Sequence, residues 1–277
     1  MGALQLGTGE LDLLAGCPPC QGFSALRTRN GARPNRDSRN ALIDQMLRFA
    51  TVLRPKTVMM ENVPHLERHI SFRRLCAGLE QLGYEVSWDV KDLAGYGVPQ
   101  RRKRLILLAG KGFKIPFPAE STLLTTVRST IGKLPQAGSS GDALHDLPER
   151  RSAKIMQLIR DIPKNGGSRG DLPKGRQLPC HRDFDGFRDV YGRMAWDNVA
   201  PTITGGCFNP SKGRFIHPIE DRAITMREAA LLQTFPLNYK FPNPKNKEAI
   251  ALMIGNALPP EFIRRQAEVI LESLRAT

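Results

Sequence analysis

The chain has 277 residues, of which 40% are apolar, enough to bury one hydrophobic core and a second small one. Its formal net charge is +14, with a sequence pI near 10.0. This charge favours a polyanionic partner, because neutralised phosphates release their counterions, although a basic protein without such a partner has the same composition. The odd number of cysteines and the lack of a secretory signal predict reduced thiols in the cytoplasm. No apolar run reaches the ~20 residues that span a bilayer, so no membrane partner is expected.

Strand and helix patterns alternate in the first part of the chain. Short apolar runs, closed by glycine, proline or polar residues, predict buried strands at residues 11–15, 57–60 and 105–109, and alternation predicts another strand over 84–90. Apolar residues at helical spacing predict helices over 42–53, ended by Pro55, and over 72–82, ended by Gly83. This β-α-β-α-β order predicts an α/β fold with a Rossmann-like, mostly parallel sheet covered by helices.

The amino-acid composition changes at about Pro116. Gly, Pro, Ser and basic residues dominate as far as Trp196, and only residues 155–162 have helical periodicity. This composition predicts a small loop-rich domain, with a partly disordered insertion as the alternative. We therefore divide the chain into residues 1–115, 116–195 and 196–277, the last returning to the first domain.

Two helices are expected after Arg222. Thr225 and Glu228 have the S/T-x-x-E spacing of a capping box, which predicts that a helix begins there. The last helix starts at Pro259-Pro260, and its apolar face is expected to pack on the sheet. That face consists of Ile263, Ala267, Ile270, Leu271 and Leu274.

The loop after the first strand, Gly16-Cys17-Pro18-Pro19-Cys20-Gln21-Gly22, is a candidate for nucleophilic chemistry. Parallel sheets place their ligands at the carboxyl ends of strands, and a cysteine there is well placed to attack one. Cys17 and Cys20 also fit a redox pair, half of a zinc site or structural cysteines in a turn. Two prolines between them are unusual for a redox pair, and no second ligand pair follows for zinc.

Charged residues lie at the ends of two other predicted strands, after residues 57–60 and before residues 105–109. Glu61 comes directly after residues 57–60, and parallel pairing of neighbouring strands would bring it close to the Cys20 loop. A carboxyl group there can serve as a general acid if burial raises its pKa, whereas an isolated glutamate in a turn is usually only solvated. Arg102 and Arg104 precede the strand at 105–109 and would share one face of it. Two guanidiniums on one face hold a carboxylate, phosphate or carbonyl oxygen, and a solvated basic edge is the alternative. Gly255 and Asn256 allow close approach of a ligand to the backbone, although many loops have this composition.

Taken in chain order, these segments resemble the family of DNA cytosine-5 methyltransferases. The matching motifs are Gly-x-Pro-Pro-Cys20-Gln-Gly-Phe-Ser, Glu61-Asn-Val, Gln100-x-Arg102-x-Arg104, Arg222-x-x-Thr225-x-Arg-Glu with Gln233-x-Phe-Pro, and Gly255-Asn256-x-x-Pro-Pro. Five motifs in the right order are specific, whereas each alone is weak. The similarity covers about residues 10–110 and 190–277, and the middle matches no motif, as in a target recognition domain.

The resemblance implies an S-adenosylmethionine-dependent methyltransferase fold and an enzyme that methylates C5 of a flipped cytosine in double-stranded DNA. Cys20 would be the nucleophile, Glu61 would bind N3 of the base, and Arg104, with Arg102 beside it, would hold O2. Pro19, Leu42, Asn256 and Leu258 match positions that line the pocket of the methyl donor. A restriction-modification role and a regulatory role both fit these residues.

One part of the family pattern is not found in residues 1–277. Relatives begin with a strand and a Phe-x-Gly-x-Gly loop, followed by an acidic residue that holds the donor's ribose, and neither precedes Leu11. We therefore expect the fold to be incomplete at its N-terminal side and the activity to need the missing N-terminal half, which would lie either on a separate chain or ahead of a reading frame that starts too late or is broken. The alternative is a catalytically inactive DNA-binding fragment, and a third hypothesis, a thiol redox or metal protein, conflicts with the intact motif order.

Overall fold

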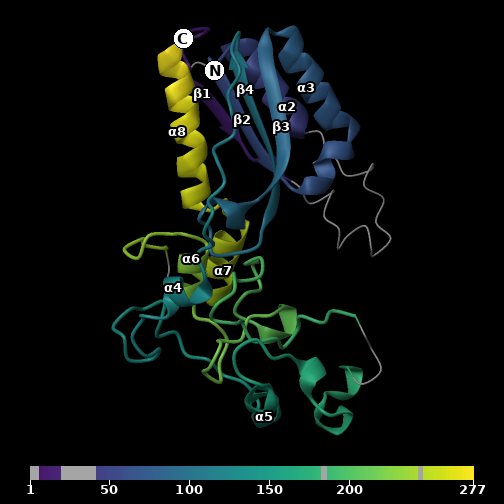
Figure 1. Ribbon diagram of the computed structural model, residues 1–277, viewed down its shortest axis with the longest axis vertical. Helices are drawn as coiled ribbons and strands as arrows, with labels where there is room; N and C mark the ends of the chain where they lie inside the picture. The colour runs from purple at the N-terminus through teal and green to yellow at the C-terminus, as the bar shows by residue number, and fades with distance from the viewer. Residues whose placement is uncertain (1–5, 20–41, 182–185, 243–245) are drawn as a thin grey trace. The chain divides into compact units, whose positions relative to one another are not determined.

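A computed structural model describes residues 6–19, 42–181, 186–242 and 246–277 of the chain. The chain divides into two compact units (Figure 1). Unit 1 comprises Met1–Asp92, Lys103–Ala119 and Arg264–Thr277, and unit 2 comprises Leu93–Arg102 and Glu120–Ile263. The candidate nucleophile Cys20 lies outside the described residues.

Unit 1 contains a four-stranded sheet of order β1-β2-β4-β3. Its strands are β1 (Leu13–Gly16), β2 (Thr57–Asn62), β3 (Tyr84–Asp92) and β4 (Lys103–Lys111). β1 pairs with β2 in parallel, with Leu13 opposite Thr57. β4 is antiparallel to both of its neighbours, with Glu61 of β2 opposite Ile106.

The expectation of a mostly parallel sheet is therefore wrong for these four strands, because one of the three pairs is parallel. The β-α-β-α-β order itself is confirmed: β1, β2 and β3 run in the same direction, joined through helices, and β4 is inserted between β2 and β3. The chain between β3 and β4 is the short segment Leu93–Arg102, which contains only a 3₁₀ turn. A parallel return needs a crossover of roughly a dozen or more residues, usually a helix, so β4 returns antiparallel to β3.

Helices α2 (Leu42–Leu53) and α3 (Ile70–Gln81) cover one face of the sheet, and α8 (Pro260–Ala276) lies on the other side (Figure 1). α3 ends where the sequence predicted, and the following Gly83 takes the left-handed φ of +87° that closes the helix. The core on this face joins Ile43 and Met46 of α2 to Leu75 of α3, with alternate residues of β2 and β4 between them. Thr57, Met59 and Glu61 therefore point to the face opposite α2 and α3.

The predicted apolar face of α8 is only partly right. Ile270 of that face is buried and Leu274 is half-buried, whereas Ile263, Ala267 and Leu271 are exposed. The buried residues of α8 are Phe262, Gln266 and Ile270, which also have helical spacing and lie about 100° from the three exposed residues around the helix axis. The sequence showed only that this helix is amphipathic, because a buried glutamine does not read as a core residue.

Unit 2 is built around short helices and long loops. Its helices are α4 (Val127–Ile131), α5 (Ala153–Asp161), α6 (Met226–Leu232) and α7 (Lys247–Asn256). Its larger core packs α6 and α7 against Ile203, Phe215 and their neighbours. Residues 196–263, expected to return to the first domain, pack in unit 2, and only residues from Arg264 onward belong to unit 1.

Candidate active site

Glu61 is held in place at the end of β2 in unit 1. Its side chain is 8% exposed, and its Oε1 lies 2.7 Å from Nε of Arg104, itself 16% exposed, near the start of β4. In the antiparallel register Glu61 lies opposite Ile106. Arg104 is two residues from Ile106 on β4, so it points to the same face of the sheet as Glu61 and is its diagonal neighbour. An arginine so placed fixes the orientation of a buried carboxylate.

The start of the Cys20 loop is tied to the same strand. Asn62, next to Glu61, donates from Nδ2 to the carbonyl of Pro18 at 2.9 Å. The thiol of Cys17 donates to Oε2 of Glu61 at 2.6 Å. The residues that lead into Cys20 are therefore bound to the Glu61-Asn62 dipeptide, and Cys17 is a partner of Glu61 that sequence reasoning had given no role.

The hydrogen-bond partners of Arg102 differ from those of Arg104. It belongs to unit 2 and is 3% exposed. Its guanidinium donates to the carbonyls of Ile203 at 3.1 Å and Gly255 at 3.0 Å. The two arginines, expected to share one face, thus bind a carboxylate in one case and backbone carbonyls in the other. A role for Arg102 beside the base stays a prediction.

The candidate donor residues lie in both units. Pro19 and Leu42 of unit 1 are exposed, as is Asn256 in unit 2, and Leu258 is half-buried. Gly255 and Asn256, expected in a loop, are the last residues of α7, which sequence reasoning missed. Two features of the sequence could have predicted this helix. Asn246 is a typical N-cap residue and accepts from the backbone N–H of Ala249, and Ile250 and Ile254 have the i, i+4 spacing of a helix.

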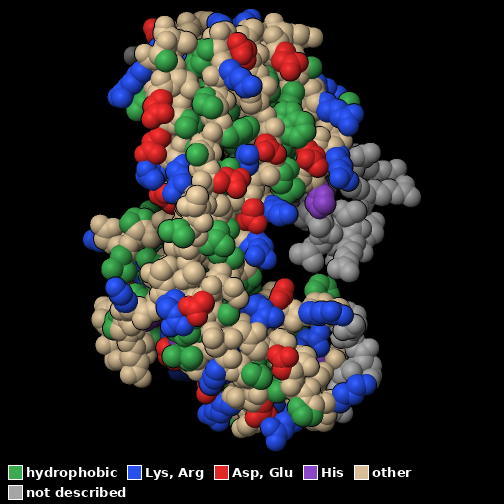
Figure 2. Space-filling view, viewed as in Figure 1, with side chains coloured by type: hydrophobic (Ala, Val, Ile, Leu, Met, Phe, Trp, Pro, Cys, Tyr) green, Lys and Arg blue, Asp and Glu red, His purple; other side chains and the backbone are tan. Residues whose placement is uncertain are grey.

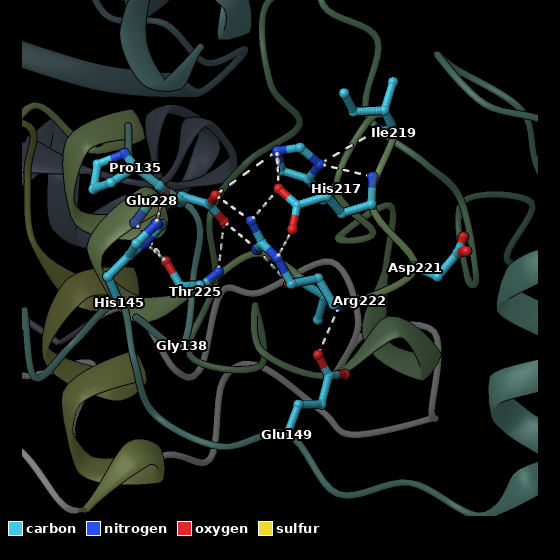
Figure 3. A network of polar contacts seen from close by, with 12 residues as sticks. Pro135, Gly138, His145, Glu149, His217, Ile219, Asp221, Arg222, Thr225 and Glu228 are labelled. Carbon is cyan, nitrogen blue, oxygen red and sulfur yellow. Dashed lines mark hydrogen bonds and ion pairs between the residues drawn. The ribbon is translucent and has the colours of Figure 1, made fainter. Parts of the chain in front are cut away.

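The Arg222 motif forms a polar network at the start of α6 (Figure 3). Arg222 binds Glu220 and Glu228 at distances from 2.8 to 3.0 Å, two bonds to each carboxylate. Thr225 and Glu228 form the predicted capping box, which is confirmed. Burial of Glu228 opposes its ionisation, but Arg222 outweighs this and lowers the pKa of Glu228.

His217 lies beside this network (Figure 3). Its Nδ1 accepts from the backbone N–H of Glu220 at 3.0 Å, so its Nε2 carries the proton of the neutral ring. Burial lowers the pKa of His217 to about 4, although Glu228 and Glu220 act in the opposite direction. The network is buried and internally paired, which indicates that it supports the fold of unit 2.

These motifs agree with a comparison against protein families. A family model for the C-5 cytosine-specific DNA methylase matches residues 3–272. The chain belongs to this family. It is therefore a DNA cytosine-5 methyltransferase, and the methyl donor of such enzymes is S-adenosylmethionine.

Curated relatives of this methylase include two type II enzymes. It is 39% identical over 263 residues to the type II methylase M.HgiDII of Herpetosiphon aurantiacus, covering 89% of this chain and 72% of that protein. It is 33% identical over 270 residues to the type II methyltransferase M1.HphI of Haemophilus parahaemolyticus, covering 95% of this chain and 69% of the relative.

Solved structures show the same fold. One, described as a DNA modification methyltransferase encoded within a prophage of E. coli, has a TM-score of 0.66 at 20% identity, with 95% of this chain and 79% of the other covered. The Dnmt2 methyltransferase of S. pombe has a TM-score of 0.53 at 17% identity, with coverage of 95% and 78%. No helix among the described residues is both long and apolar enough to cross a membrane.

Two arginines that contribute to the positive charge of the methylase hold loops of unit 2 together. Arg193 is fully buried in unit 2 and donates to the carbonyls of Ile159, Ile162, His217 and Glu220. Arg169, in the region expected to choose the target, is 5% exposed and donates to the carbonyl of Gly186 at 2.7 Å.

A cavity of about 620 Å³ in unit 2 is lined by Arg193 together with Arg101 and Arg214. Arg214 binds Asp189 and the carbonyl of Gly166. Lysine and arginine side chains are scattered over the face in Figure 2 rather than gathered in one patch.

Proposed function

We propose that this methyltransferase acts through a covalent bond between Cys20 and C6 of a cytosine flipped out of duplex DNA. The observation that carries the proposal is the anchored carboxylate of Glu61. Arg104 holds one of its oxygens, and the neighbouring Asn62 holds the loop that leads into Cys20. A nucleophile next to an oriented acid is the arrangement that covalent activation of a base needs.

The chemistry balances as follows. The Cys20 thiolate attacks C6, and the electron pair of the C5–C6 bond becomes available at C5 while Glu61 protonates or hydrogen-bonds N3. S-adenosylmethionine supplies the methyl group that C5 takes up. Loss of the proton from C5 and elimination of the Cys20 thiolate then restore the aromatic ring and release 5-methylcytosine.

Arg104 has two tasks in this proposal. Its Nε orients Glu61, and its Nη1 donates to the carbonyl of Lys103 at 2.8 Å. Its Nη2 would donate to O2 of the base, where negative charge grows when Cys20 attacks. Cys17 occupies the second oxygen of Glu61 and gives way when the base arrives. A free cysteine has a pKa of about 8.5, and we propose that the cationic side chain of Arg104 favours the thiolate of Cys20.

The residues proposed for the donor fit an amphiphilic ligand. Leu42 and Pro19 expose apolar surface suited to the adenine ring, and Asn256 exposes a carboxamide at the end of α7. Leu258 offers a half-buried apolar contact. We propose that these four side chains bind S-adenosylmethionine.

We further propose that residues outside 1–277 contribute a Phe-x-Gly-x-Gly loop to the donor site. Among the described residues β1 pairs on one side only, with β2, so its other edge is open to a further strand. The exposed apolar residues of α8, Ile263 and Leu271, offer surface for an added helix or strand. These features support a preceding half that extends the sheet, on this or another polypeptide.

The function is tested by transfer of tritiated methyl groups from S-adenosylmethionine to mixed-sequence duplex DNA, followed by digestion to nucleosides. The label is expected in 5-methyldeoxycytidine, to rise when a polypeptide with the Phe-x-Gly-x-Gly loop is added, and to vanish in Cys20→Ser. Label in another nucleoside, or label that survives Cys20→Ser, contradicts the covalent mechanism. Robust turnover by residues 1–277 alone contradicts the added donor loop, and DNA binding without label in either arm favours an inactive DNA-binding fragment.

A further inference from the structure

Side chains from two distant motifs of unit 2 converge on one short piece of backbone. Arg102 donates from Nη2 to the carbonyls of Gly255 at 3.0 Å and Ala257 at 3.4 Å. Gln233 donates from Nε2 to the same carbonyl of Ala257 at 2.5 Å. These carbonyls flank Asn256, whose own side chain is exposed.

Hydrogen bonds with Gln100 and with the backbone of Ile203 hold the side chains of Arg102 and Gln233 in place. Gln100 donates to Oε1 of Gln233 and accepts from the backbone N–H of Ile203 at 3.0 Å. Arg102 binds the carbonyl of the same Ile203. Gln100 and Gln233 are fully buried and Arg102 nearly so, so none of the three can turn toward solvent without leaving buried polar groups unpaired.

A close approach of another segment also fixes this backbone. A Cβ atom at Gly255 would lie 2.2 Å from the backbone nitrogen of Gly205 and 2.3 Å from the carbonyl carbon of Thr204. Only glycine lets the end of α7 approach so closely. The backbone of Gly255–Ala257 is therefore held by close packing against Thr204 and Gly205 and by hydrogen bonds from Arg102 and Gln233.

We infer that Gln100, Arg102 and Gln233 are positioning residues for the methyl donor, because they set the backbone from which Asn256 and Leu258 reach it. This inference rests on the proposed function, which assigns those two side chains to S-adenosylmethionine. Arg102 then acts on donor binding through the Gly255–Ala257 backbone, whereas Arg104 acts at the base, both directly and through Glu61. Lysine cannot replace Arg102, because one ammonium group cannot span three carbonyls as a planar guanidinium does.

The test uses Arg102→Lys and Gln233→Glu in the protein preparation that methylates DNA, with Arg73→Lys on the exposed surface of α3 as a matched control. The dissociation constant for S-adenosylmethionine is measured by calorimetry, and covalent trapping on 5-fluorocytosine DNA is measured at saturating donor. Both variants are expected to weaken donor binding at least tenfold, to keep DNA affinity within about twofold, and to trap DNA normally once donor is saturating. The control keeps its donor affinity.

Unchanged donor affinity with lost trapping in Arg102→Lys would overturn the inference and place Arg102 at the base. Unchanged donor affinity and unchanged trapping in both variants would overturn it as well. Gln233→Glu keeps Arg102 and the acceptor for Gln100, and replaces the donor to Ala257 by a carboxylate oxygen that repels that carbonyl. It decides the matter if Arg102→Lys fails to fold. A wild-type preparation that neither methylates nor traps DNA contradicts the proposed function itself, before any variant is compared.

Discussion

At the scale of single residues, the carboxylate of Glu61 is engaged at both oxygens, by Arg104 and by Cys17. We expect Glu61→Gln to slow methylation by about 100-fold or more, because an amide cannot supply a proton to N3. Single-turnover methylation with saturating DNA measures this. Glu67→Gln, whose carboxylate pairs with the exposed Arg68, is the control and should keep the wild-type rate. A full rate in Glu61→Gln would remove Glu61 from the mechanism.

His217 gives unit 2 a sensitivity to acid. Its pKa in the folded protein, about 4, lies below the ordinary 6.5, so the unfolded chain binds this proton more readily. The stabilisation is therefore complete above about pH 6.5 and is lost as the pH falls toward about 4. Between about pH 7 and about pH 5 the loss from this residue is about 2 kcal/mol. Glu228, with its lowered pKa, adds to the loss at still lower pH.

Urea unfolding at the two pH values measures this loss. His217→Gln should remove most of the pH dependence in that interval, even if it lowers stability at neutral pH. Exposed His65→Gln serves as the control. An equal loss of stability on acidification in wild type and His217→Gln would mean that His217 does not titrate as its burial implies.

At the scale of elements, the capping boxes of α6 and α4 allow a paired comparison. Thr225 caps α6, is 8% exposed and also binds Nδ1 of the buried His145 at 2.8 Å. Thr126 caps α4 in the same way, but its hydrogen bonds are exposed. Thr225→Ala should cost about 2 kcal/mol, because a cap is lost and His145 loses a partner, whereas Thr126→Ala should cost about 1 kcal/mol or less. Chemical denaturation of both variants measures the difference, and equal costs would contradict the role of His145.

Local patterns predicted the elements of unit 1 better than their pairing. The helical spacing of α2 and the alternation of β3 are local signals, and both elements were found where expected. The antiparallel insertion of β4 was missed, because strand direction depends on the length of Leu93–Arg102 and on which strands pair.

The candidate site was predictable only in part, because some of its contacts join segments that are far apart in the sequence. The motif spacing and the parallel β1–β2 neighbours predicted that Glu61 lies near the loop that leads into Cys20. The partners of Arg102 come from Ile203 and from residues around Asn256, far along the chain, so no local pattern could reveal that its guanidinium binds carbonyls.

At the scale of the whole molecule, the net charge of +14 favours DNA, but the burial of Arg169 and Arg193 shows that part of it serves the fold. Lys174 and Arg176 are exposed in the region 116–195 that we propose to choose the target sequence. Replacing Arg176 with alanine should weaken DNA binding on all sequences and lower the slope of log affinity against log salt by about 1. Fluorescence titration over a range of salt concentrations measures this. A change confined to one DNA sequence would assign Arg176 to base recognition instead.

Exchange of residues 116–195 for the equivalent segment of a relative tests the division of labour. Because Glu61, Asn62 and Arg104 lie outside this segment, the chimera should keep the chemistry and methylate a different sequence. Bisulfite sequencing of randomised DNA identifies the methylated site. An active chimera with the original target would show that sequence choice lies elsewhere.

The central claim is that Cys20, in the loop held by Asn62, forms the bond to cytosine. The most direct test is to incubate the protein with S-adenosylmethionine and duplex DNA that contains 5-fluorodeoxycytidine, because fluorine cannot leave C5 as a proton and the adduct persists. Fragmentation mass spectrometry of the digested complex then locates the modified residue. We predict an adduct on Cys20 that is lost in Cys20→Ser and kept in Cys17→Ser. An adduct on Cys17, or trapping that survives Cys20→Ser, would contradict the account.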